Sequence, residues 1–226
     1  MSYGPDYYAR SADELGWGAG HRPDAFKLEV LRRHVVGARI ADVACGPGVY
    51  AAALAGDGRQ IVGVDFSAAL LKQGRRPGWL PVAASGMSLP LRDGWADTTC
   101  LLSVLEHVDD AALLREATRV TSRRLVIQVP LEEPRLLAES GLLFSHWSDR
   151  SHLRTYSRPS LEQLLSNAGW RMAEFIPAYP RDLQEAFVRG IEAPEVVRNA
   201  VRALLKPLRG LSPRPAAEAF VVAEPR

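Results

Sequence analysis

The feature that most constrains the fold is the pattern between residues 39 and 55. An apolar segment, Arg39–Cys45, runs into a turn with Gly46 and Gly48, and small apolar residues follow over Val49–Ala55. A strand, a glycine turn and a closely packed helix form the first unit of a doubly wound sheet. Glycine lets the backbone approach a ligand, and the free amides of the helix point to the same place. A tight turn also needs glycine for steric reasons alone, so the two glycines by themselves do not establish a ligand site.

The same alternation continues along the chain. A helix over Asp24–Val36 precedes the first strand, because its apolar residues recur at helical spacing. Apolar segments predict six further strands, at Gln60–Asp65, Leu80–Ala84, Thr98–Val104, Arg124–Val129, Trp170–Ile176 and Ala217–Ala223. Helices are predicted between them at Ser67–Gly74, Asp109–Arg119 and Ser160–Ala168. The order indicates an α/β protein with a doubly wound, mostly parallel, seven-stranded sheet and helices on both faces.

The length of the chain favours a single domain. A chain of 226 residues with 47% hydrophobic content can bury one sizeable core. We therefore expect one domain over residues 1–226, with a helical cap at residues 1–37. A helical insertion is predicted at residues 181–214, before the last strand, from helical patterns at Leu183–Ile191 and Pro194–Leu205.

Composition limits the partners. The 28 Lys and Arg residues nearly balance 26 Asp and Glu residues, and no basic run stands out, so we expect neither a nucleic-acid nor a membrane partner. The two cysteines lack the paired spacing of a disulfide framework or a zinc site. The first residues lack a signal-peptide pattern, and no window is apolar enough to span a membrane. We expect a cytoplasmic protein that is a monomer or a homodimer.

Asp65 adds chemistry to the glycine turn. It ends the second predicted strand, where a carboxylate can accept hydrogen bonds from both hydroxyls of a ribose. The alternative is a cap for the following helix, but Ser67 is better placed for that role. We favour the ribose.

At this point the sequence resembles the class I S-adenosylmethionine-dependent methyltransferases. The segments 42–48 (DVACGPG) and 62–67 (VGVDFS) are similar to the two cofactor motifs of that family. The resemblance implies that Asp42 and the turn hold the methionine part of the cofactor, Asp65 the ribose and Phe66 a face of the adenine. It also implies an antiparallel last strand. Ala44 stands where the family has its first glycine.

Later segments extend the resemblance over residues 38–176. Residues 85–91 are similar to the loop that meets the adenine, although Ser85 stands where the family commonly has an acidic residue. Backbone groups of Gly86 and Met87 are further candidates for that contact. Residues 102–108 resemble the segment that borders the methionine and the transferred methyl group, which adds Leu105. Residues 152–170 resemble the connection into the sixth strand.

Histidines are the candidate bases. If the acceptor is a hydroxyl or an ammonium group, a base must remove a proton, and histidine titrates in the useful range. His107 follows the fourth strand, where ligands of an open α/β sheet bind. Its alternative role is a helix-start residue bonded to a neighbouring aspartate. His152 is either catalytic or braces the connection near Tyr156, and His146 is a third candidate.

The stretch from His146 to His152 also has the spacing of metal ligands, but nothing nearby in sequence completes a set. We expect an exposed loop there and no metal. Trp147, Tyr156 and Trp170 either wall an acceptor pocket or pack in the core.

These observations predict an enzyme that transfers a methyl group from S-adenosylmethionine to a small molecule, with oxygen as the favoured acceptor and nitrogen or carbon as alternatives. Two other classes stay open. A nucleotide-dependent oxidoreductase has a similar glycine turn, and a non-catalytic scaffold or regulatory module can retain the cofactor pocket.

Overall fold

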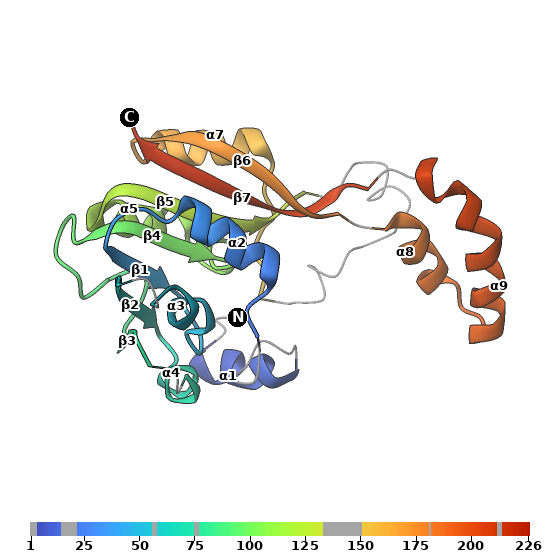
Figure 1. Ribbon diagram of the computed structural model, residues 1–226, viewed down its shortest axis with the longest axis horizontal. Helices are drawn as coiled ribbons and strands as arrows, with labels where there is room; N and C mark the ends of the chain where they lie inside the picture. The colour runs from blue at the N-terminus through green and yellow to red at the C-terminus, as the bar shows by residue number, and fades with distance from the viewer. Residues whose placement is uncertain are drawn as a thin grey trace.

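The computed structural model describes residues 4–14, 22–55, 58–74, 77–132, 151–180, 182–211 and 214–226. Figure 1 shows the arrangement of the elements. The strands are β1 (Arg39–Val43), β2 (Gln60–Asp65), β3 (Leu80–Ala83), β4 (Ala96–Leu102), β5 (Thr121–Pro130), β6 (Trp170–Pro180) and β7 (Ala216–Pro225). The helices are α1 (Pro5–Glu14), α2 (Ala25–His34), α3 (Val49–Leu54), α4 (Ala68–Gln73), the short η2 (Leu105–His107), α5 (Asp110–Val120), α7 (Arg158–Asn167), α8 (Leu183–Gly190), α9 (Glu195–Leu205) and η4 (Lys206–Leu211).

The strands form one seven-stranded sheet in the order β3-β2-β1-β4-β5-β7-β6. Neighbours from β3 to β5 are parallel, whereas β7 runs antiparallel to both β5 and β6. The expected mostly parallel sheet with an antiparallel last strand is confirmed. Insertion of β7 beside β5 also distinguishes this sheet from the 3-2-1-4-5-6 order of dinucleotide-binding domains.

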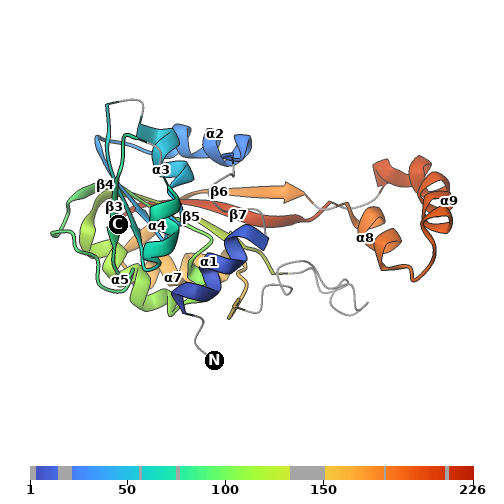
Figure 2. The same cartoon turned by 90° about the horizontal axis from the view of Figure 1, so that it is seen from below.

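Helices cover both faces of the sheet (Figure 2). Along β1, Ile40 packs with Leu31 of α2 and Leu54 of α3 in one core cluster. Ala41 and Val43 join the larger cluster, to which α5 and α7 contribute on the opposite face. The alternation of side chains along a strand therefore supplies two cores, as a doubly wound sheet requires.

Polar side chains cap the helices that follow strands. The Ser67 hydroxyl accepts a hydrogen bond from the Leu70 amide, and the Asp109 carboxylate accepts one from the Ala112 amide. The fourth strand ends two residues earlier than predicted, because Ser103 adopts a left-handed conformation with φ of 52°. That change of direction carries η2 across the carboxyl end of the sheet.

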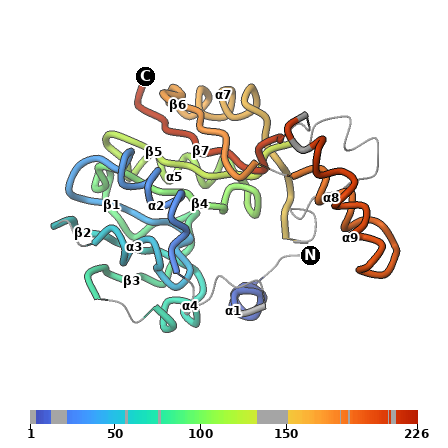
Figure 3. Tube along the Cα trace, turned by 45° about the vertical axis from the view of Figure 1, so that its right-hand side comes forward, coloured from blue at the N-terminus to red at the C-terminus, as the bar shows by residue number. Residues whose placement is uncertain are grey.

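The helices predicted within residues 181–214 are present as α8 and α9, between β6 and β7. They lie beyond the ends of those two strands, away from β1–β3, rather than over the sheet edge (Figure 3). Val196 and Leu204 of α9 are strongly exposed. Among the described residues, none of the helices has the length and apolar character needed to cross a membrane.

Candidate functional site

A cavity of about 770 Å³ opens at the carboxyl ends of β1, β2 and β4. Ligands of open α/β sheets bind at this edge, because loops there converge from neighbouring strands. Most of the predicted site residues line it: Asp42, Ala44, Gly46, Asp65, Phe66, Ser85, Gly86, Met87, His107 and His152. The structure thus brings together residues that lie far apart in the sequence.

The turn after β1 has an unusual backbone. Ala44, Gly46 and Gly48 all have positive φ, of 58°, 55° and 67°. Glycine adopts such angles readily, whereas an alanine pays about 1–2 kcal/mol in steric strain. Ala44 stands where the family has glycine, so its positive φ produces backbone strain at a residue that lines the cavity.

Asp65 joins the turn to the second strand. Its two carboxylate oxygens accept hydrogen bonds from the amides of Gly46 and Ser67, each at 2.8 Å. The carboxylate therefore bonds the start of the next helix, the alternative weighed from sequence, while the Ser67 hydroxyl caps that helix as expected. A carboxylate oxygen can accept more than one hydrogen bond and Asp65 lines the cavity, so the ribose contact stays a prediction.

Two predicted cofactor residues lie outside the cavity lining. Leu105 is fully buried in the larger core cluster, and its neighbour Val104 lines the cavity instead. Gly48 faces Trp79, because a Cβ at this position would lie 2.1 Å from the indole ring. Packing against Trp79, together with the positive φ, accounts for this glycine.

Two buried carboxylates face the same end of the cavity. Burial, and then the neighbouring Asp65, raise the pKa of Asp42 to about 7. Burial also raises the pKa of Asp65, against the opposing effect of the amides of Ser67 and Gly46. A positively charged ligand group beside Asp42 would stabilise its ionised form.

Lys27 of α2 is a cavity residue that sequence reasoning missed. Its ammonium lies 5.1 Å from the centre of the Tyr50 ring, and burial lowers its pKa despite several carboxylates nearby. Among the residues that the structure describes, we find no ion pair of this ammonium, and no other Lys or Arg lines the cavity. In the sequence, Lys27 stands within a predicted helix, and the helical pattern does not indicate a function for its side chain.

Two imidazoles also line the cavity. The His107 and His152 rings meet edge-on with centroids 4.6 Å apart, and Tyr8 of α1 packs 5.7 Å from His107. His107 Nδ1 shares a 2.8 Å hydrogen bond with the Ser151 hydroxyl. His107 thus contacts the segment that contains Ser151, and it also lines the cavity.

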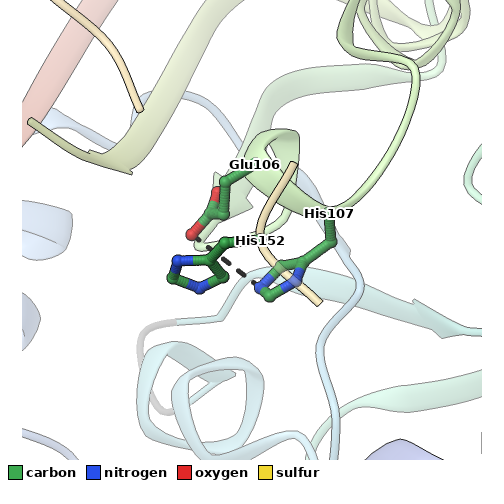
Figure 4. A group of neighbouring side chains, drawn as sticks. All are labelled: Glu106, His107 and His152. Carbon is green, nitrogen blue, oxygen red and sulfur yellow. Dashed lines mark ion pairs between the residues drawn. The ribbon is translucent and has the colours of Figure 1, made fainter. Parts of the chain in front are cut away.

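Glu106 lies beside these imidazoles (Figure 4). Its carboxylate is 2% exposed, with Oε1 4.0 Å from His107 Nε2. One ligand atom each from Glu106, His107 and His152 lie within 4.8 Å of one another, so the three side chains are able to hold a metal ion. The sequence pointed instead to the stretch 146–152, of which only residues 151 and 152 are described.

Two of the three aromatic candidates, Trp170 and Tyr156, make structural contacts. Trp170 is buried, and its indole donates a hydrogen bond to the Thr118 hydroxyl, which favours core packing. The buried Tyr156 hydroxyl donates to Asp110 at 3.0 Å. His146 and Trp147 lie outside the described residues.

The strand order and the position of the cavity define the class I methyltransferase fold. A S-adenosylmethionine-dependent methyltransferase from Archaeoglobus fulgidus superposes with a TM-score of 0.66 at 17% identity, over 97% of this chain and all of that one. Geranyl diphosphate C-methyltransferase from Streptomyces coelicolor superposes with a TM-score of 0.64 at 15% identity, over 89% of this chain and 79% of that one.

Sequence comparison agrees. Residues 41–124 match the family model of the methyltransferase domain. A demethylmenaquinone methyltransferase from Corynebacterium kroppenstedtii is 40% identical over 85 residues, which is 37% of this chain and 37% of that relative. The match thus spans well under half the length of the relative. Residues 41–124 are thus similar to a methyltransferase domain, and the described chain has the fold of class I methyltransferases.

Proposed function

We propose that the chain binds S-adenosylmethionine in the cavity and transfers its methyl group to a small molecule. The observation that carries this proposal is the set of residues that share one cavity at the carboxyl ends of the strands. The glycine turn, Asp65 and the half-exposed Phe66 line this cavity together with two imidazoles. A cofactor bound along the glycine turn directs its sulfonium toward the imidazoles.

The residues present suit each part of the cofactor. Asp42 favours the amino group of the methionine part, Asp65 lies beside the ribose position, and Phe66 offers an apolar face to the adenine. We assign Lys27 to the carboxylate of the methionine part, because it is the one Lys or Arg among the lining residues that the structure describes.

The Lys27 assignment has a test that uses the ligand as well as the protein. In the wild type, S-adenosylhomocysteine should bind about tenfold to a hundredfold more tightly than 5′-methylthioadenosine, which lacks the amino-acid part. Lys27→Met should weaken the former and leave the latter nearly unchanged, whereas Lys27→Arg should retain much of the difference. Equal losses for both ligands would remove Lys27 from the carboxylate site.

Methyl transfer from a sulfonium is an in-line displacement, so positioning supplies much of the acceleration. We propose a hydroxyl oxygen as the acceptor, with His107 and His152 as the side chains that activate it. The names of the demethylmenaquinone methyltransferase relative and of the structural neighbour that is a C-methyltransferase support carbon as a second candidate. A deprotonated hydroxyl on an unsaturated carbon is nucleophilic at its oxygen and at the adjacent carbon of the double bond.

The N-terminal helices contribute to the same cavity. Tyr8 of α1 lies against Phe66, with ring centroids 5.6 Å apart, and α2 supplies Lys27. We propose that residues 1–37 act as a cap over the cofactor.

Incubation with methyl-labelled S-adenosylmethionine and a panel of small hydroxylated compounds tests the activity, and the position of the label in the product tells oxygen from carbon. Label transfer to at least one acceptor is expected. Tight cofactor binding without transfer to any compound in a cell extract would favour a scaffold or regulatory module instead.

A further inference from the structure

The side chains of Glu106, His107 and His152 lie close together, and the two histidines line the cavity (Figure 4). The short helix η2 supplies the first two, and the Leu153 amide donates a 2.7 Å hydrogen bond to the Glu106 carbonyl, which holds His152 beside them. The hydrogen bond between Ser151 and His107 Nδ1 leaves Nε2 as the ring nitrogen that faces Glu106. The backbone and a neighbouring hydroxyl thus fix the orientation of this cluster.

We propose that these three side chains bind a divalent first-row transition ion. Metal–nitrogen and metal–oxygen bonds of about 2.0–2.2 Å place neighbouring ligands of one ion roughly 3–3.5 Å apart. The 4.0 Å between Glu106 Oε1 and His107 Nε2 and the spread within 4.8 Å are wider than this, so the side chains would close around the ion by about 1 Å or more.

The chemistry of the set selects the ion. Two imidazoles with one carboxylate favour manganese, iron, cobalt or zinc over magnesium and calcium, which prefer all-oxygen sites. Histidines that bind a metal commonly form a hydrogen bond to a neighbouring group through their second ring nitrogen. Ser151 supplies such a group at Nδ1 of His107. Two of the three side chains line the cavity, so the remaining coordination positions are open to the acceptor.

This site deepens the proposed function by naming an acceptor class, and it rests on that function. A small molecule with a hydroxyl beside a second oxygen would occupy two of the open positions. Coordination lowers the pKa of the hydroxyl, which releases its proton to water. The oxygen then attacks the methyl carbon; the O–C bond forms as the S–C bond breaks, and sulfur keeps the electron pair, which gives S-adenosylhomocysteine. His107 and His152 therefore activate the hydroxyl as ligands rather than as proton acceptors.

The test is a calorimetric titration of the chelator-treated full chain with Mn²⁺ and with Zn²⁺. One ion per chain is expected. Glu106→Gln and His152→Ala should each weaken binding at least about tenfold. Glu162→Gln, which alters an exposed carboxylate on α7, should leave binding unchanged. Thermal melts of each variant show whether it folds.

Methyl transfer measured with and without chelator gives a second readout. Loss of turnover with chelator, and recovery on addition of Mn²⁺ or Zn²⁺, are expected. Failure of both ions to bind stoichiometrically, or equal binding by the wild type and both folded site variants, would overturn the metal site. Methyl transfer that persists in chelator would also overturn it while leaving the proposed function intact, whereas failure to bind S-adenosylhomocysteine would refute that function.

Discussion

Replacing Asp42 with asparagine should change how the stability of the ligand-free protein depends on pH. Burial, and then Asp65, raise the pKa of Asp42 from 3.8 to about 7. The folded chain thus holds a proton that the unfolded chain releases between about pH 4 and pH 7. Stability is therefore lost as pH rises through this window. Asparagine has nearly the same shape and does not ionise, so it should remove that loss.

The size of the effect follows from the two pKa values. Between about pH 5 and pH 8, ionisation of Asp42 should lower the free energy of unfolding by about 2.5 kcal/mol. Urea unfolding of the wild type and Asp42→Asn, measured across this range, isolates the contribution, because other titrating groups are shared. The difference in free energy should grow in favour of the variant up to about pH 7 and then level off. A difference that is independent of pH would refute the raised pKa.

Three further predictions concern the turn and the imidazoles. Ala44→Gly should relieve the left-handed strain and raise the free energy of unfolding by about 1 kcal/mol, seen as a higher melting temperature; an unchanged or lower value would show that no strain is stored there. Asp65→Asn should weaken S-adenosylhomocysteine binding by about 1–3 kcal/mol in calorimetry, and unaltered affinity would remove Asp65 from the ribose site. His107→Ala should lower turnover by roughly a hundredfold or more with cofactor affinity nearly intact. Unaltered turnover of this variant would leave His107 a packing role alone.

The sheet was predictable from sequence because its signals are local. The glycine turn, the apolar strands and caps such as Ser67 and Asp109 each act within a few residues. The strand limits were less accurate. Nothing in the residue type of Ser103 indicates the positive φ that ends β4, because tertiary contacts at the end of the sheet impose it.

The site was predictable only where it follows a strand. Asp42 is the next-to-last residue of β1 and Asp65 is the last residue of β2, so their positions follow from the topology. Lys27 reaches the cavity from a helix that precedes the sheet, and Glu106 lies near His152, which is 46 positions further along the chain. Such contacts depend on tertiary packing, which no local pattern reports. Leu105 was predicted to contact the cofactor, but its neighbour Val104 lines the cavity and the Leu105 side chain is fully buried in the core.

The most direct test of the central claim is calorimetric titration of the purified chain with S-adenosylhomocysteine and, separately, with NADH. A site of one S-adenosylhomocysteine per chain, weakened by Lys27→Met, with no heat of binding for NADH, is the predicted result. Binding of NADH without binding of S-adenosylhomocysteine would contradict the assignment of the cavity and favour an oxidoreductase.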